Sequence, residues 1–190
     1  MTLVLEPGHC IDLEPGRRLL LDVGGVVPAE RTSQVEINAT CVTVSTDGRA
    51  IYSVYGHSLR TPDYSVKYIG YRHPRVNAGP NKGESFELDL GAVPGNIAAI
   101  YVMLSAYPVA HFDFAGRAYV DFHYGTEEQA THFGHYELPV ETGSQGVLLA
   151  RIVRNGAGWQ LQVLGLPFKI ESENELAAQA ASHFAPPAGS

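Results

Sequence analysis

The stretch that decides the fold runs from Glu84 to Ala106 and reads ESFELDLGAVPGNIAAIYVMLSA. In its first part Phe86, Leu88 and Leu90 alternate with acidic residues, which is typical of a strand with one face on a core. After a Val-Pro-Gly turn, Ile97–Ala106 is almost wholly apolar, as expected of a central strand that is covered on both faces. The two patterns in succession predict neighbouring β-strands.

Strand patterns recur on both sides of this stretch. Val35–Ser45 is rich in Val, Ile and Thr, and its alternation places Ile37, Ala39 and Cys41 on one face. An Asp-Gly turn joins it to a second short strand, as in a hairpin. Further strands are predicted at 2–5, 18–23, 50–55, 65–70, 117–124 and 131–138, and a last hairpin at 147–164. The segments 24–33 and 73–83, rich in Gly and Pro, are predicted to be loops.

The composition agrees with an all-β fold. The chain of 190 residues has 20 Gly and 12 Pro, and only 17% of its residues are charged. We therefore predict an antiparallel β-sandwich of about nine or ten strands with a short C-terminal helix. Ser172 and Glu175 have the spacing of a capping box before an Ala-rich helix at Leu176–Phe184. The predicted division is a sandwich domain at 1–168, followed by the helix and a disordered tail at 169–190.

Charge and hydropathy limit the kinds of binding partner and the cellular location that we expect for this protein. The formal net charge is −7 and no basic face is visible, so nucleic acid is not an expected partner. No apolar run is long enough to cross a bilayer. The N-terminus has no signal-peptide pattern, so we expect a cytoplasmic protein in which Cys10 and Cys41 are reduced.

Three segments in the second half resemble the TerD family of bacterial tellurium-resistance and stress proteins. Glu84–Pro94 is similar to an acidic block of that family, and Ile97–Val102 to the apolar strand that follows it. Gly146–Leu161 resembles the final hairpin of the family, with its Arg, Gly and Trp. Weaker matches at 36–40, 45–49 and 111–115 keep the same order, so the resemblance covers about residues 2–165.

The resemblance implies a cytoplasmic β-sandwich that binds calcium, is linked to tellurite resistance and stress responses, and has no defined catalysis. By family position the calcium ligands would be Glu36, Asn38, Asn77, Asn81 and Glu84. Calcium takes six to eight oxygens, and its affinity falls as the ligands lose charge. The acidic loops of the family are replaced here by neutral and basic residues, among them Arg72, Arg75 and Lys82. We therefore expect a calcium site that is weakened or lost.

The histidines are the main alternative to calcium. His132 and His135 have the spacing of a metal-ligand pair, and His111 and His123 lie nearby in the sequence. Residues three apart on a strand point to opposite faces, however, unless a turn at Gly134 intervenes. Structural or surface histidines are the plainer interpretation. A metal-dependent enzyme based on these residues is kept as an alternative.

Three other groups of residues carry weaker functional signals. Asp121 and His123 share a predicted strand face, yet no serine motif accompanies them and a pair defines no reaction. Cys41 is predicted to face inward, where thiols are usually inert. Ten tyrosines, five of them between Tyr52 and Tyr71, could line a groove for a sugar or peptide, although packing between strands is the commoner role.

The sequence therefore predicts a non-enzymatic, TerD-like binding or scaffold protein in the stress response. A protein partner is expected, but its nature and the oligomeric state are left open. The alternatives are the histidine-based enzyme and a β-sandwich module that binds a sugar or peptide.

Overall fold

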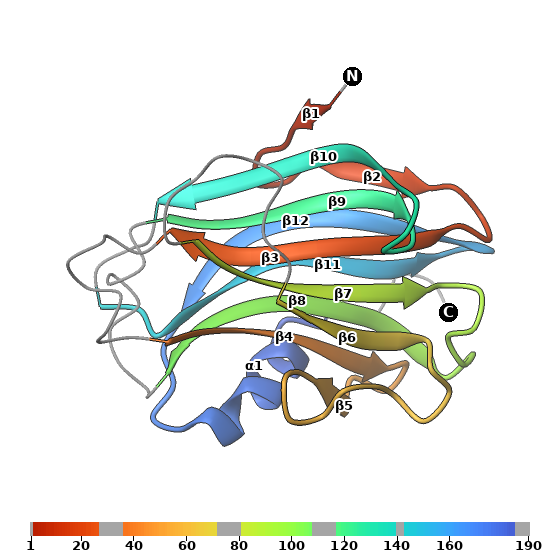
Figure 1. The fold of residues 1–190 in the computed structure, drawn as a ribbon. Helices are drawn as coiled ribbons and strands as arrows, with labels where there is room; N and C mark the ends of the chain where they lie inside the picture. The colour runs from red at the N-terminus through yellow and green to blue at the C-terminus, as the bar shows by residue number, and fades with distance from the viewer. Residues whose placement is uncertain (1, 27–35, 72–80, 108–116, 140–142, 185–190) are drawn as a thin grey trace.

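The computed structural model describes residues 2–26, 36–71, 81–107, 117–139 and 143–184. These ranges form two six-stranded sheets packed face to face (Figure 1). Sheet A contains, in spatial order, β1 (Leu3–Val4), β10 (Ala130–Pro139), β9 (Arg117–Gly125), β3 (Arg18–Val26), β7 (Asn81–Asp89) and β6 (Val66–Tyr71). Sheet B contains β2 (Cys10–Leu13), β12 (Gly158–Phe168), β11 (Gly146–Asn155), β8 (Ile97–Tyr107), β4 (Glu36–Ser45) and β5 (Ala50–Val54). The predicted β-sandwich is confirmed.

The core lies between the two sheets and follows from the period-two pattern of the strands. Leu19, Leu21 and Val23 of β3 are fully buried in it, and Ile100 and Val102 of β8 lie in the same cluster. Burying one such side chain contributes about 1.5–3 kcal/mol relative to leaving it exposed. The shared apolar face therefore holds the two sheets together.

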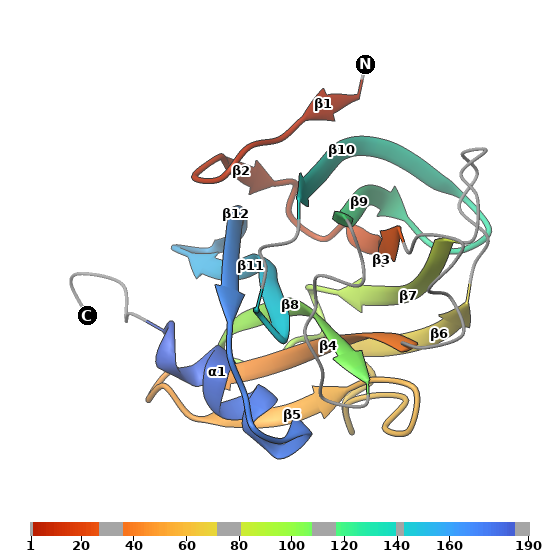
Figure 2. The same cartoon turned by 90° about the vertical axis from the view of Figure 1, so that its left-hand side faces the viewer.

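A second apolar layer covers the outer face of sheet B. The intervening residues of β8, including Tyr101 and Met103, are also fully buried, together with Val42 and Val44 of β4. They are covered by the segment after β12, which ends in a 3-10 turn (Glu173–Glu175) and the helix α1 (Leu176–Ser182) (Figure 2). The prediction that β8 is buried on both faces is confirmed.

The structure differs from the sequence-based expectation at several element ends. Twelve strands are present in the described ranges where about nine or ten were expected. The four-residue edge strand β2 was not predicted, because Leu13 is its single fully buried residue and gives no alternation. β3 continues through Gly24 and Gly25 to Val26, and β7 begins at Asn81, because these two stretches pair with each other. Pairing partners, which no local pattern shows, decide such ends.

The C-terminal helix is shorter than predicted and begins differently. Ser172 Oγ donates to Glu175 Oε1 at 3.2 Å, as a capping box would suggest. The two residues enclose the 3-10 turn, however, and Glu175 immediately precedes α1 without a side-chain cap of its own. Because α1 has only seven residues, packing on sheet B must stabilise it, since isolated helices of this length are unstable.

Arg154 fastens the final hairpin to the turn before β8. Its guanidinium donates to the carbonyl oxygens of Ile97, Val93 and Pro94 at 2.8, 2.9 and 3.0 Å, and lies 4.4 Å from the centre of the Trp159 ring. The indole N–H of Trp159 donates to the carbonyl of Leu90 at 3.2 Å. The Arg and Trp of the hairpin motif therefore have a structural role here.

The close contact at Gly146 generates a prediction about stability. A Cβ at this position would lie 2.5 Å from the Leu104 carbonyl oxygen and closer still to the Phe168 ring. We expect Gly146→Ala to lower the free energy of unfolding by about 1–3 kcal/mol through overpacking. Urea denaturation measures this, with Gly95→Ala as the control because a Cβ there meets open space. Equal stability of the two variants would contradict this account of the contact.

Candidate functional site

Glu84, a predicted calcium ligand, lies inside the sandwich. It is on the inward face of β7 and only 4% of its surface is exposed. Its Oε2 accepts a hydrogen bond from the main-chain N–H of Ala39 in β4, and its Oε1 accepts one from the Tyr68 hydroxyl at 2.9 Å. A buried carboxylate needs such donors to offset the loss of hydration. Both oxygens therefore serve contacts within the protein.

Of the other four predicted calcium ligands, Asn38 is the one whose side chain the structure describes. Asn38 pairs with Ser105 on the outer face of sheet B, whereas its neighbours Ile37 and Ala39 point into the core. Glu36 and Asn81 are placed by their main chain only, at the beginnings of β4 and β7. Asn77 lies outside the described residues, as do Arg72 and Arg75. Glu84 and Asn38 are the two of the five whose side chains are described. Glu84 of sheet A lies between the sheets, whereas Asn38 lies on the outer face of sheet B.

Cys41 lies near Glu84 in the same interior and is inaccessible to solvent. Burial raises the pKa of its thiol far above the usual range, and the charge of Glu84 raises it further. The thiol is therefore protonated and unreactive, as its inward-facing position in the strand predicted.

A β-bulge in β10 brings His132 and His135 to one face of sheet A. His132 pairs with His123 of β9 and His135 with Asp121, but Gly134 pairs with Phe122, so Phe133 is an extra residue in the ladder. Phe133 stacks on Tyr124 with ring centres 4.3 Å apart. The extra residue cancels the alternation that would otherwise separate the two histidines. The sequence pattern requires a turn at Gly134 for His132 and His135 to share a face. The structure meets this requirement with a β-bulge beside Gly134 and not with a turn.

Asp121 is the centre of this cluster. His135 Nδ1 donates to Asp121 Oδ1 at 2.7 Å, and His132 Nε2 lies 3.1 Å from the same oxygen. His132 Nε2 also donates to the carbonyl oxygen of Gly134 at 2.9 Å. Because a carbonyl only accepts, this nitrogen carries a hydrogen and has no free lone pair for a metal ion.

Asp22 extends the cluster onto β3. It lies directly opposite Asp121 in the pairing of β3 with β9, so two carboxylates share one outer face. Such a pair repels unless cations or donors are near. Ser85 donates its hydroxyl hydrogen to Asp22 Oδ1, and His123 Nε2 lies 3.2 Å from Asp22 Oδ2 without the angle of a hydrogen bond. The rings of His123 and His132 are 4.7 Å apart, which links the two halves.

Tyr119 completes the cluster with a buried hydroxyl that has no hydrogen-bond partner in the described structure. Burial raises the pKa of Tyr119 to about 12, and the charges of Asp121 and Asp22 add to the effect. Asp22 and Tyr119 were missed from the sequence. A single carboxylate in the apolar run Arg18–Val23 was a usable signal for Asp22, because unpaired charges are seldom placed in such strands.

The cluster is built for internal ion pairing. Within the described ranges no three His, Cys, Asp or Glu side chains are placed to share one metal ion. His111, which was considered with the others, lies outside those ranges. The arrangement instead places three imidazoles beside two neighbouring carboxylates, and the hydrogen bond from His135 to Asp121 raises the pKa of His135.

The tyrosines between Tyr52 and Tyr71, for which packing was the favoured role and a groove the alternative, divide into two groups among those with described side chains. Tyr68 packs edge-on against Phe86 and serves Glu84. Tyr52, Tyr55 and Tyr64 are exposed by 40%, 38% and 48%. The exposed group lies in β5 and the loop that follows it.

His135 gives the cluster a testable pH dependence. The hydrogen bond to Asp121 raises the pKa of His135 above its ordinary value of 6.5. The stability from this pair should therefore be fully present below pH 6.5 and lost as the pH rises through the folded-state pKa. We expect His135→Gln to cost at most about 1 kcal/mol at acidic pH, and less at alkaline pH, because the pair is partly exposed.

Urea denaturation at a series of pH values measures this difference. His57→Gln is the control, since the exposed ring of His57 packs edge-on against Tyr55. A cost of His135→Gln that grows as the pH rises would contradict the predicted sign.

Comparisons with known proteins agree with this architecture. The family model described as TerD domain matches residues 1–179. A crystal structure described as a homologue of the telluride resistance protein TerD, SCO6318 from Streptomyces coelicolor A3(2), superposes with a TM-score of 0.61 at 19% identity, covering 86% of this chain and 97% of that one. A protein of unknown function, SAV2460, gives 0.64 at 16% identity, covering 88% and 98%.

The two solved structures share the fold of this chain. Because their sequence identity is below 20%, the comparison supports a statement about fold alone. No match was found among curated protein sequences. In the described ranges no helix is both long and apolar enough to cross a membrane. Because the family model matches residues 1–179 of the 190-residue sequence, the chain belongs to the TerD domain family.

Proposed function

We propose that this protein is a non-enzymatic binding or scaffold member of the TerD family whose calcium site is weakened or lost. The proposal includes the family's association with tellurium resistance and stress responses and a location in the bacterial cytoplasm. The observation that carries the proposal is the position of Glu84. By family position this residue is the one carboxylate retained from the acidic loop of the TerD family.

Glu84 is poorly suited to bind calcium. Its oxygens accept hydrogen bonds from the Ala39 N–H and the Tyr68 hydroxyl, and Asn38 faces the other side of the sheet. Calcium needs six to eight oxygens, several of them charged, at 2.3–2.6 Å. An ion at Glu84 would have to displace donors that already stabilise a buried charge. The described residues therefore favour a carboxylate that ties β7 to β4.

The histidine cluster supports a non-catalytic role in the same way. Its strongest contacts lie within the cluster, and His132 Nε2 is committed to the Gly134 carbonyl. A general base or metal ligand needs a nitrogen lone pair directed at the reacting group. The exposed aromatic residues after β5 are better placed to contact another molecule.

Calorimetry tests the calcium part of the proposal. We expect no heat of binding when calcium is titrated into metal-free protein at micromolar concentrations. Thermal unfolding gives a second readout, since a site with a Kd of about 1 µM would add roughly 4 kcal/mol at 1 mM calcium. An unfolding midpoint that does not move is the expected result. Micromolar binding would overturn the proposal of a weakened site.

Glu84→Gln tests the structural role of the carboxylate. The neutral amide loses the charge that strengthens both hydrogen bonds, and its single acceptor oxygen leaves an NH2 group where the carboxylate accepted from the Ala39 N–H or from the Tyr68 hydroxyl. We expect a loss of about 1–3 kcal/mol in the free energy of unfolding, equal with and without calcium. Glu128→Gln, at an exposed glutamate in the turn between β9 and β10, is the control. A loss that appears only when calcium is present would identify Glu84 as a ligand.

A further inference from the structure

Tyr64 has a backbone conformation that L-amino acids rarely adopt. Its φ is 62°, and it is the single non-glycine residue with positive φ in the described part of the chain. For a bulky aromatic residue this is a strained conformation, because Cβ approaches the following carbonyl. Strain of this kind persists where the surroundings enforce it, and it is often found at functional sites.

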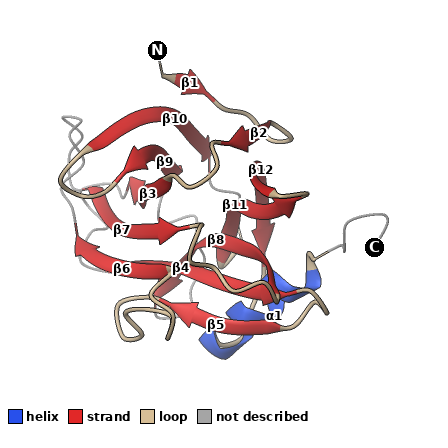
Figure 3. Ribbon diagram, turned by 90° about the vertical axis from the view of Figure 1, so that its right-hand side faces the viewer, coloured by secondary structure: helices blue, strands red, loops and turns tan. Residues whose placement is uncertain are grey.

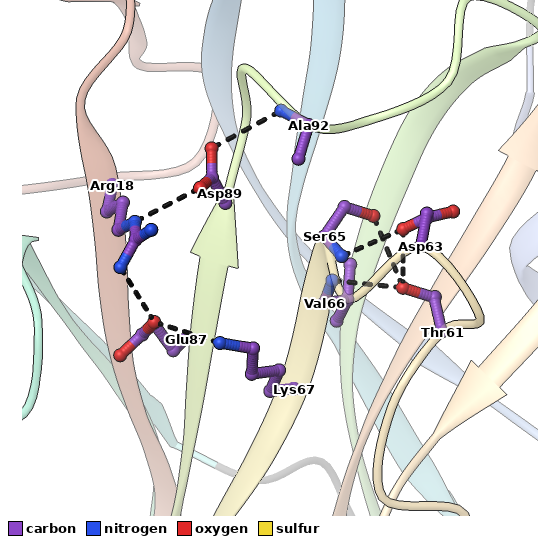
Figure 4. Close-up of polar contacts among 9 residues, drawn as sticks. All are labelled: Arg18, Thr61, Asp63, Ser65, Val66, Lys67, Glu87, Asp89 and Ala92. Carbon is purple, nitrogen blue, oxygen red and sulfur yellow. Dashed lines mark hydrogen bonds and ion pairs between the residues drawn. The ribbon is translucent and has the colours of Figure 1, made fainter.

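A hydrogen-bonded turn enforces the conformation (Figure 4). Asp63 Oδ1 accepts hydrogen bonds from the Thr61 hydroxyl and the Ser65 N–H, both at 2.8 Å. The Val66 N–H donates to Thr61 Oγ1 at 3.2 Å, and the Tyr64 N–H donates to the Thr61 carbonyl at 3.0 Å. None of these bonds uses the Tyr64 side chain. A glycine at this position would allow the same turn without strain.

The ring of Tyr64 gains little from burial in return. It is 48% exposed, and its closest partner is the Arg60 guanidinium, whose carbon lies 4.2 Å from the ring centre. Arg60 is itself exposed. A tyrosine that is strained and remains half in solvent has no stabilising role that would explain it.

Arg60 is also unusual among the arginines of the described ranges. The other six each bind a carboxylate, an amide or carbonyl oxygens, as Arg18 does with Glu87 and Asp89 (Figure 4). Arg60 has the Tyr64 ring and no ion pair there. Lys67, opposite it on β6, is paired with Glu87 at 3.5 Å, and both donors at Asp63 come from the turn. The guanidinium therefore lies over a ring, and within the described ranges its N–H groups have no carboxylate partner.

The main chain of Arg60 does not use its own hydrogen-bonding groups in the pairing with β6. The Leu59 carbonyl accepts from the Tyr68 N–H at 2.8 Å, and the Thr61 N–H donates to the Val66 carbonyl at 3.0 Å. These bonds pair 59–61 with β6 and direct the N–H and carbonyl of Arg60 away from it. An extended chain can bond to such an edge.

Exposed large hydrophobic residues are frequent in the sequence around this edge. Of the eight large hydrophobic residues that are exposed in the described ranges, five lie between 51 and 64: Ile51, Tyr52, Tyr55, Leu59 and Tyr64. They belong to β5 and the loop to β6, on the side of the sandwich where the two sheets end in β5 and β6 (Figure 3). Tyr and Arg in such settings are the residues that most often dominate binding energy at interfaces.

We propose that Arg60 and Tyr64, with the main-chain edge at 59–61, form a docking surface for an extended peptide segment of a protein partner, and that the segment presents an acidic side chain next to an apolar one. The guanidinium would receive the carboxylate in a bidentate pair, and the exposed Tyr64 ring would receive the apolar group. This rests on the proposed function as a binding module and names its partner by chemistry. A sugar is a poorer fit, because the nearby Asp63 carboxylate is engaged within the turn.

A phage-displayed library of random 12-residue peptides, selected against the full chain, tests the proposal. Selected peptides should carry Asp or Glu beside an apolar residue. Arg60→Gln and Tyr64→Gly should each weaken their binding at least about tenfold. Tyr64→Gly should also raise the unfolding midpoint by a few degrees, because the strain is relieved, so lost binding cannot be ascribed to unfolding. Leu3→Ser, at a side chain equally exposed on β1, should bind as the wild type does.

Peptides without an acidic residue, or peptides whose binding ignores both substitutions, would overturn this surface and leave the protein a binding module of another kind. A library that yields no binder would overturn it as well. A glycan array run in parallel would do the same if it gave binding that Tyr64→Gly abolishes. None of these outcomes depends on the calcium titration, so the two proposals can fail separately.

Discussion

The burial of β8 on both faces is the constraint on which the rest of the structure depends. Alternate residues of this strand enter the core between the sheets, and the intervening ones enter the layer on the outer face of sheet B. A strand that is apolar on both faces must be covered twice. Sheet A covers one face, and the segment after β12 with α1 covers the other. The C-terminal segment is therefore part of the packing of this fold, although its helix is short.

The polar features of the molecule lie where the packing of the two sheets and the C-terminal segment provides hydrogen-bond donors or access to solvent. Glu84 enters the interior beside β4, where main-chain and tyrosine donors are available to it. The His–Asp cluster lies on the outer face of sheet A, where partial exposure permits charge. The loop after β5 carries the Arg60 guanidinium, which has no ion pair within the described ranges, and a strained tyrosine. Of these three, the loop is the feature whose groups are still available to another molecule.

Much of the candidate chemistry could be read from residue types but not from their partners. The sequence showed Glu84 as the remaining acidic residue and His132 and His135 as a spaced pair. It did not show that Glu84 faces inward toward Ala39. A loop was expected up to residue 83, whereas β7 already begins at Asn81 and pairs with β3 from there. It also did not show the bulge, since Phe133 and Gly134 carry no local signal that one of them is unpaired. Both depend on register, which is set between strands.

Hydrophobic periodicity in the sequence by itself determined the all-β class, the face of Ile37, Ala39 and Cys41, the double burial of β8 and the final hairpin, because each is a property of one strand or one turn. Only the tertiary structure decided which strands are neighbours, that Asp22 meets Asp121, and that Arg154 and Trp159 serve the turn before β8. It also revealed the positive φ of Tyr64, which hydrogen bonds of the turn impose against the preference of the residue. Local patterns show which face of each segment must be buried. Contacts between residues distant in sequence depend on how all the segments pack and pair with one another.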